Sequence, residues 1–254
     1  MGKTKEKLRK GEPALGGWIM IPHPTTAELL AGEGFDWIAV DMEHTSTDVR
    51  TFHEIALALK GTGVDLLARL HSCDPILAKK ILDAGGNGII VPFVNTREEA
   101  ELAVAMAKFP PVGFRGSSFC RAADFGRNFK AYFRAHNDSV IVAVMMEHFK
   151  AVENADAILS VPGIDAVFIG PYDLSASMGR AGEISHPEVV GALQKIVDAC
   201  KRHGVPPGLH VVSVDPDDVQ RRIEQGYRFI ACGIDTEFVM YGCRKILERV
   251  KRNG

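Results

Sequence analysis

The chain alternates short apolar runs with segments of helical spacing. The clearest run is Ser139–Glu147, in which seven apolar residues precede a carboxylate. A run this short and rich in Val and Ile is typical of a strand buried on both faces, as in a parallel sheet. A second run, Ala166–Asp173, repeats the arrangement after one helical segment. Neighbouring parallel strands that each end in an acid predict a divalent-metal site, although acids are also common as helix caps where strands end.

The same alternation recurs along the whole chain without a linker between units. Asp74-Pro75 opens one helix, and a capping box that begins at Thr96 opens another. Eight strand–helix units predict an α/β fold, a single (β/α)8 barrel over residues 1–254, with 1–11 as an N-terminal arm or short helix and the site at the C-terminal ends of the strands. The predicted strands are Ala14–Ile21, Trp37–His44, Asp65–Leu70, Gly88–Val94, Ser139–Glu147, Ala166–Asp173, Gly208–Val212 and Phe229–Asp235, and other predicted helices are Thr25–Gly34, Thr47–Lys60, 149–159, Pro187–His203, Asp215–Gln225 and 236–252.

A long segment, residues 109–128, interrupts this rhythm before the fifth strand. It is rich in Gly, Phe and Arg and has no regular apolar spacing. Long irregular segments inside compact domains tend to be functional, and mixed Phe and Arg suit a ligand or a partner surface. We therefore expect a functional loop here; the alternative is a mobile surface insertion.

Composition narrows the class of partner. The 254 residues are 46% hydrophobic and 24% charged, with a net charge of −2 and no block of like charge, which argues against nucleic acid and anionic membranes as partners. No apolar run approaches the ~20 residues of a membrane span, and the charged N-terminus lacks the apolar stretch of a secretory signal. Five scattered cysteines without a Cys-x-x-Cys pair favour a reducing cytoplasm.

Polar residues gather where the predicted strands end. Arg69 is flanked by apolar residues and is expected to point into the barrel mouth, either to hold a developing oxyanion or as one half of a buried ion pair. His44 lies three residues after Asp41, so the carboxylate could orient the imidazole as a general base, or His44 could be a plain hydrogen-bonding residue. The strand-end set is Asp41, Glu43, His44, Arg69, Glu147, Asp173 and His210.

The placement of lysines and histidines restricts the chemistry further. Every lysine falls in a predicted helix, loop or terminus, whereas a Schiff-base aldolase needs a desolvated strand lysine. The histidines show neither His-x-His nor His-Glu-x-x-His spacing, which gives a zinc hydrolase little support. Carbanion chemistry in this barrel would therefore use a metal as electron sink.

An ordered set of motifs resembles one family, the HpcH/HpaI class II pyruvate aldolases, which includes 4-hydroxy-2-oxoheptanedioate and 2-keto-3-deoxyglucarate aldolases. The similarity runs from about residue 12 to 240. The motifs are Asp41-x-Glu-His44, Ala68-Arg69, Gly88-Ile-Ile-Val-Pro92, Gly113-Phe-Arg-Gly116, Glu147 followed by Ala151-x-x-Asn154, and Gly170-Pro-Tyr-Asp-Leu-Ser175 with Gly179.

The resemblance implies a metal-dependent aldolase that reversibly cleaves a 4-hydroxy-2-oxo acid to pyruvate and an aldehyde through a metal-bound pyruvate enolate. It implies a homohexamer, a dimer of trimers, in which the C-terminal helix is exchanged between subunits and the Arg115–Arg127 loop helps to shape the aldehyde pocket. Glu147 and Asp173 would ligate Mg2+, Mn2+ or Co2+. The implied catalytic residues are Arg69 at the keto oxygen and His44 held by Asp41, and the implied substrate-binding residues are Gly170, Pro171, Tyr172, Met145, Trp18 and Leu209.

Two departures from the family pattern bear on the substrate. Met145 stands where the family usually has Gln, and Tyr172 stands where it often has a small residue. By the resemblance, Met145 would remove a polar contact near pyruvate, and Tyr172 would crowd the substrate pocket. Three other functions stay open: a CoA-thioester lyase of the citrate-lyase-like group, a catalytically silent barrel, and a phosphate-binding barrel enzyme, for which Cys232-Gly-Ile-Asp235 offers only one glycine.

Overall fold

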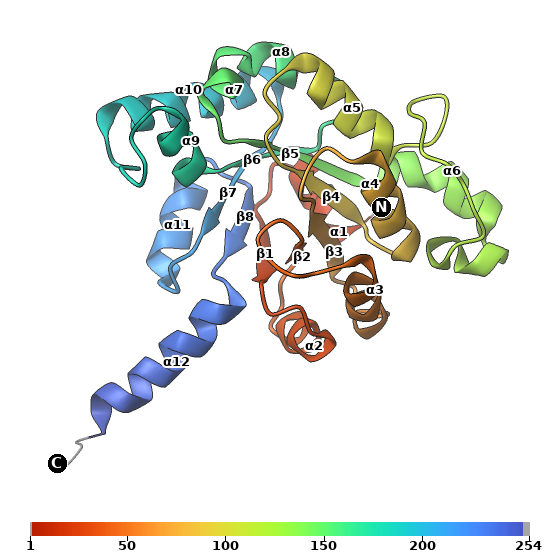
Figure 1. Ribbon diagram of the computed structural model, residues 1–254, viewed down its shortest axis with the longest axis horizontal. Helices are drawn as coiled ribbons and strands as arrows, with labels where there is room; N and C mark the ends of the chain where they lie inside the picture. The colour runs from red at the N-terminus through yellow and green to blue at the C-terminus, as the bar shows by residue number, and fades with distance from the viewer. Residues whose placement is uncertain (1, 251–254) are drawn as a thin grey trace.

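The computed structural model describes residues 2–250, and in it eight parallel strands close into a barrel in chain order. Helices surround the strands (Figure 1), so the predicted (β/α)8 barrel is confirmed. The strands are β1 (Ala14–Ile19), β2 (Trp37–Asp41), β3 (Asp65–Arg69), β4 (Gly88–Val91), β5 (Ile141–Met146), β6 (Ala166–Ile169), β7 (Pro207–Val211) and β8 (Phe229–Cys232). The helices are α1 (Lys3–Arg9), α2 (Pro24–Gly32), α3 (Val49–Ala58), α4 (Pro75–Ala84), α5 (Arg97–Ala107), the 3-10 helix η1 (Arg121–Gly126), α6 (Phe129–Ser139), α7 (Phe149–Glu153), α8 (Ala155–Leu159), α9 (Pro171–Ser177), α10 (Pro187–His203), α11 (Pro216–Glu224) and α12 (Asp235–Arg249).

Alternating strand residues divide the apolar residues into two clusters. On β5, Ala143 and Met145 belong to a small cluster inside the barrel, whereas Val144 and Met146 belong to the large cluster between the barrel and the helices. Because side chains alternate along a strand, the next position, Glu147, again faces the barrel interior. This alternation delivers the carboxylate to the barrel mouth.

The N-terminal segment is a helix that closes the opposite end of the barrel. Helix α1 buries Lys5, which donates to the carbonyl of Val140 at 2.5 Å and to the carboxylate of Asp165 at 3.0 Å. Those two residues lie just before β5 and β6, so the contact is at the N-terminal ends of the strands. Leu8 joins the cluster inside the barrel. Of the two descriptions predicted for the N-terminal segment, the short helix is the one observed, over Lys3–Arg9.

Three local features differ from the predicted pattern. Helix α6 was not predicted, although Phe129, Tyr132, Phe133 and His136 have helical spacing. The predicted helix 149–159 is two short helices that meet at Asn154. Strand β6 ends at Ile169 because Pro171 opens α9, so Asp173 lies in the first turn of α9 rather than on the strand.

The segment 109–128 packs against the side of its own barrel. The guanidinium of Arg121 donates to the carbonyls of Ala84 and Ala56 at 2.7 and 2.8 Å; Ala84 is the last residue of α4, and Ala56 lies in the last turn of α3. Helices of a barrel run antiparallel to its strands, so this contact lies toward the N-terminal ends of the strands, away from the mouth of the same subunit. The rings of Phe114, Phe119 and Phe125 are exposed.

Helix α12 projects from the barrel into solvent (Figure 1). Val239, Met240, Ile246 and Leu247 are exposed along it. The predicted helix 236–252 ends in residues 251 and 252, which lie outside the described part of the chain. In residues 2–250 no helix is long and apolar enough to cross a membrane, and the five cysteines form no disulfide.

Candidate active site

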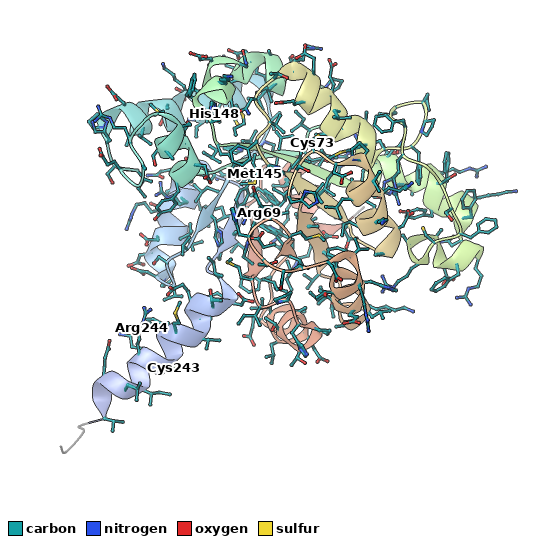
Figure 2. All side chains as sticks on the ribbon, viewed as in Figure 1. Arg69, Cys73, Met145, His148, Cys243 and Arg244 are labelled. Atoms are coloured by element: carbon teal, nitrogen blue, oxygen red, sulfur yellow. The ribbon has the colours of Figure 1, made fainter. Side chains whose placement is uncertain are left out.

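A buried pair of opposite charges, Asp41 and Arg69, forms the centre of the barrel mouth. The two residues are register partners on β2 and β3. Both oxygens of the fully buried Asp41 carboxylate accept from Arg69, through Nε at 3.1 Å and through Nη2. The guanidinium also lies over the ring of Trp18, 5.2 Å from its centroid. Figure 2 labels Arg69 and Met145 at the centre of the ring of helices.

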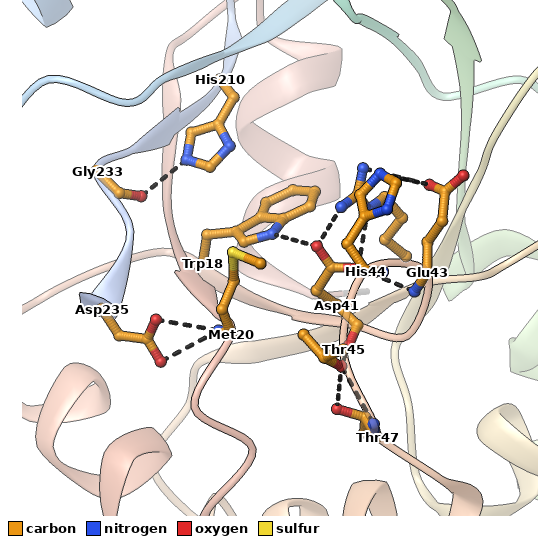
Figure 3. A network of polar contacts seen from close by, with 11 residues as sticks. Trp18, Met20, Asp41, Glu43, His44, Thr45, Thr47, His210, Gly233 and Asp235 are labelled. Atoms are coloured by element: carbon orange, nitrogen blue, oxygen red, sulfur yellow. Dashed lines mark hydrogen bonds and ion pairs between the residues drawn. The ribbon is translucent and has the colours of Figure 1, made fainter. Parts of the chain in front are cut away.

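Asp41 organises the loop that follows β2. Besides Arg69, its carboxylate accepts from the backbone amides of Glu43 and His44 at 2.9 and 3.1 Å, and from the indole of Trp18 at 3.2 Å (Figure 3). Burial alone would raise the pKa of Asp41, but the hydrogen bonds and charge of Arg69 hold it below its ordinary value. Asp41 is therefore ionised at neutral pH and fixes the plane of the guanidinium.

The expected pairing of the Asp41 carboxylate with the imidazole of His44 is not observed. Asp41 binds the backbone amide of His44, because the chain turns after β2 and carries the ring outward. The ring is exposed, and its Nε2 lies 3.9 Å from Glu43 rather than against Asp41. Glu43 also lies 3.2 Å from Nη1 of Arg69. The acid that accompanies the imidazole is thus Glu43.

Glu147 is a buried carboxylate among other acids. Its side chain lies inside the barrel mouth, 1% exposed, and its Oε1 accepts from the backbone amide of Phe93 at 2.9 Å. Burial raises the pKa of Glu147 to about 7, and the charges of Glu43 and Asp173 add to the rise. The oxygens of this carboxylate are hard donors that suit a divalent cation, and the positive charge of a cation would favour the ionised form.

Asp173 is the second candidate metal ligand. It is exposed in the first turn of α9, and its negative charge contributes to the raised pKa values of both Glu147 and Glu43. Among residues 2–250 no three His, Cys, Asp or Glu side chains converge into a cage. The residues present therefore fit a cation held by Glu147 and Asp173 with its other positions open to water and substrate oxygens, which is typical of catalytic rather than structural sites.

The structure separates the predicted substrate-binding residues into two groups. Trp18 and Met145 lie in the cluster inside the barrel, and Gly170, Pro171 and Tyr172 follow β6 at its C-terminal end. Leu209 instead belongs to the outer cluster and lines a groove of about 590 Å3 beside α10. Its side chain therefore points away from the barrel interior, because side chains of β7 alternate and the next residue takes the inward position, and its role in substrate binding stays a prediction.

That inward residue is His210, which the sequence placed at a strand end but not in the site. Its ring lies 4.9 Å from that of Trp18, and its Nε2 donates to the carbonyl of Gly233 at 2.9 Å (Figure 3). Burial lowers the pKa of His210 to about 4, so the ring is neutral. Since Nε2 carries the proton, Nδ1 is the acceptor. The alternation of side chains along β7 would have shown that His210 points inward, once it was known which residue of the strand faces the barrel interior.

Gly170 leaves the space that Glu147 occupies. A Cβ on residue 170 would lie 2.6 Å from Oε2 of Glu147, and the φ of −100° is ordinary for any residue. We expect Gly170→Ala to displace the carboxylate and to weaken Mn2+ binding by about 10–100-fold, the usual effect of disturbing the groups that support a metal ligand. Calorimetry of Mn2+ binding measures this.

The matched control is Gly191→Ala in α10, where a Cβ meets nothing within 4 Å. Alanine inside a helix should raise the free energy of unfolding by about 0.5–1 kcal/mol and leave Mn2+ binding alone. Equal Mn2+ affinity in Gly170→Ala and the wild type would show that Glu147 tolerates the intrusion.

A closed barrel whose mouth joins buried acids to a carboxylate-fixed guanidinium defines a barrel enzyme equipped to stabilise negative charge on substrate oxygens. The chain belongs to the HpcH/HpaI aldolase/citrate lyase family, which matches residues 15–241. The predicted family is confirmed, and with it the predicted class of enzyme, an aldolase-type lyase.

Curated relatives and solved structures agree over the whole chain. The chain is 35% identical over 250 residues to 5-keto-4-deoxy-D-glucarate aldolase of Escherichia coli (strain K12), covering 98% of this chain and 97% of that one. A family protein from Burkholderia cenocepacia J2315 has a TM-score of 0.93 at 33% identity, covering 99% and 100% of the two chains. An HpcH/HpaI aldolase from Desulfitobacterium hafniense DCB-2 has a TM-score of 0.90 at 29% identity, covering 98% and 97%.

Proposed function

We propose that this protein is a metal-dependent pyruvate aldolase that cleaves a 4-hydroxy-2-oxo acid to pyruvate and an aldehyde. The observation that carries the proposal is the placement of two groups in the barrel mouth. One is the buried carboxyl of Glu147, whose raised pKa shows that its negative charge is not compensated, and the other is the Arg69 guanidinium that Asp41 holds rigidly. Retro-aldol cleavage leaves an electron pair on the pyruvate half, and both features oppose that negative charge.

Each residue of the mouth has a distinct part in this chemistry. A divalent ion held by Glu147 and Asp173 would supply Lewis acidity toward the carboxylate and keto oxygens of the substrate. Arg69 uses two of its five N–H groups on Asp41, and its Nη1 also lies 3.2 Å from Glu43, so the remaining N–H groups are left to donate to the keto oxygen as it gains charge. His44 is exposed beside Glu43 and would take the proton of the C4 hydroxyl through a water.

The substrate class that we propose is an acidic 4-hydroxy-2-oxo acid. The name of the Escherichia coli relative describes such a compound, because 5-keto-4-deoxyglucarate numbered from its other end is a 2-oxo-3-deoxy-4-hydroxy acid. Cleavage between its third and fourth carbons would yield pyruvate and a three-carbon aldehyde acid. The neutral imidazole of His210 and the exposed Tyr172 border the space left for the aldehyde half.

The experiment that tests this function measures pyruvate release from a panel of 4-hydroxy-2-oxo acids. Enzyme is first treated with a chelator and then assayed with and without Mn2+. Metal-dependent pyruvate release supports the aldolase. Cleavage of a CoA thioester with no release of pyruvate would indicate the citrate-lyase-like reaction, and inactivity on both substrate classes would indicate a silent barrel.

We further propose that the chain assembles into a homohexamer in which α12 packs on a neighbouring subunit. Helix α12 projects from its own barrel (Figure 1) and carries exposed apolar side chains, which rarely remain uncovered in water when they form a patch. The guanidinium of Arg121 is bound within its own subunit, so it is not proposed for the interface; the exposed Phe119 and Phe125 remain candidates.

Sedimentation at micromolar concentration should therefore show a hexamer, or at least a trimer. The double change Ile246→Asp and Leu247→Asp should yield smaller species, because each buries a charge in an apolar interface. Leu57→Asp, at an exposed apolar position on α3, is the control that should keep the assembly. A monomeric wild-type protein would contradict an exchanged helix.

A further inference from the structure

Phe93, which follows β4, has an unusual backbone conformation. Its φ is +51°, a left-handed value that bulky residues rarely adopt, and its side chain is 45% exposed, so packing does not explain it. Strained conformations persist where the surrounding structure enforces them, and they cluster at functional sites. In this conformation the amide of Phe93 donates to Oε1 of Glu147 at 2.9 Å.

Two asparagines hold the strained residue in place. The side-chain amide of Asn95 donates to the carbonyl of Phe93 at 2.9 Å. The carbonyl of Asn95 in turn accepts from the side-chain amide of Asn154 at 2.8 Å. Asn154 stands at the break between α7 and α8, and from there its side chain reaches across to the loop after β4.

The cost of this arrangement points away from a merely structural role. Oδ1 of Asn95 is buried with no hydrogen-bond partner among the described residues. A buried acceptor without a partner is unfavourable, and native proteins keep few of them. Asn95 therefore maintains its contact with Phe93 against both backbone strain and an unpaired oxygen.

We propose that Asn154 and Asn95 are positioning residues for Glu147, which they orient through the backbone of Phe93. The inference rests on the proposed role of Glu147 as a metal ligand. The backbone amide of Phe93 donates to Oε1, and the backbone of Gly170 packs next to Oε2. The carboxylate of Glu147 therefore has one orientation before any cation binds. Loss of a group that orients a metal ligand in this way typically weakens metal binding by about 10–100-fold.

The test measures Mn2+ affinity by calorimetry in Asn95→Ala and Asn154→Ala. We expect Asn95→Ala to weaken binding by about 10–100-fold, and Asn154→Ala, one contact further away, to weaken it less. Adding Phe93→Gly to Asn95→Ala should restore binding, because glycine adopts a positive φ without support and keeps the amide aimed at Glu147. A general loss of folding would not be repaired by a second truncation.

Asn137→Ala is the matched control. Asn137 also donates its side-chain amide to a phenylalanine carbonyl at 2.9 Å, that of Phe109, at a distance from the mouth. It should lower the melting temperature but leave Mn2+ affinity unchanged. Wild-type affinity in Asn95→Ala, or no restoration by Phe93→Gly, would overturn the inference while the metal site stands. Undiminished Mn2+ binding by Glu147→Ala would overturn both proposals.

Discussion

Glu147→Ala and Asp173→Ala should each abolish metal-dependent turnover while leaving the barrel folded. Each change removes one of only two carboxylates proposed to hold the cation, since no larger cluster of ligands exists in residues 2–250. Loss of the ion removes its polarising effect on the substrate oxygens, which is worth several kcal/mol of transition-state stabilisation. The rate should therefore fall by at least about three orders of magnitude, because each factor of ten corresponds to about 1.4 kcal/mol.

The measurements are kcat with saturating Mn2+ and Mn2+ affinity by calorimetry. Glu153→Ala is the control, because Glu153 is an exposed acid six residues further along the chain, at the end of α7. It should bind Mn2+ as the wild type does. If both Glu147→Ala and Asp173→Ala retain full affinity, the metal lies elsewhere in the molecule.

The raised pKa of Glu147 adds a pH-dependent result for the metal-free protein. Its pKa is about 7 in the fold against 4.5 in the unfolded chain, so between these values the folded protein binds more protons. Stability then falls as the pH rises through this interval, by about 3 kcal/mol in total. Glu147→Gln should melt higher than the wild type at pH 8 in the presence of chelator, and the difference should vanish near pH 4. A constant difference at both pH values would contradict a buried, charged Glu147.

The repeated succession of short apolar runs and segments of helical spacing was sufficient to predict the barrel and the position of Arg69 at its mouth. Strands buried on both faces are apolar throughout, so a charged residue at the end of one, such as Arg69 or Glu147, can only be accommodated at the mouth. The same apolarity conceals which face a residue takes when both neighbours are apolar. That is why the inward direction of His210, which lies between Leu209 and Val211, was not predicted.

The details of the site depend on backbone conformations that sequence spacing does not specify. Asp41 and His44 are three apart, but the turn between them directs the amide rather than the ring to the carboxylate. Likewise the position of Glu147 depends on an amide of strained Phe93 and on the missing side chain of Gly170. Phe and Gly are not typical catalytic or metal-binding residues, so a search for functional motifs does not identify either contact.

Arg69→Ala and Arg69→Lys should both lose about 10²–10³ in kcat, with pyruvate affinity changed less. Formation of the enolate moves negative charge onto the keto oxygen, so a guanidinium directed at that oxygen gains interaction energy as the charge develops. Loss of one such donor in a site that excludes water typically costs roughly 3–4 kcal/mol. Lysine is a poor substitute, because it cannot occupy both oxygens of Asp41 and still present an N–H to the substrate.

The structure adds a second expectation for Arg69→Ala. Removal of the guanidinium leaves the fully buried Asp41 carboxylate with only neutral donors, namely Trp18 and two backbone amides. An uncompensated buried charge commonly costs 3–5 kcal/mol, so Arg69→Ala should also melt at a lower temperature. Arg69→Lys keeps a positive charge and should be more stable than Arg69→Ala while remaining as slow, which separates catalysis from stability.

Exchange of the pyruvate methyl protons with D2O isolates the step assigned to Arg69, because exchange requires the enolate but no aldehyde. Both variants should fail in exchange and in retro-aldol cleavage alike. Arg228→Lys is the control: this guanidinium donates to the carbonyls of Gly11, Ile223 and Tyr227 at the opposite end of the barrel, so stability should fall without a change in exchange rate. Normal methyl exchange in Arg69→Ala, together with failed cleavage, would move Arg69 from the pyruvate half of the site to the aldehyde half.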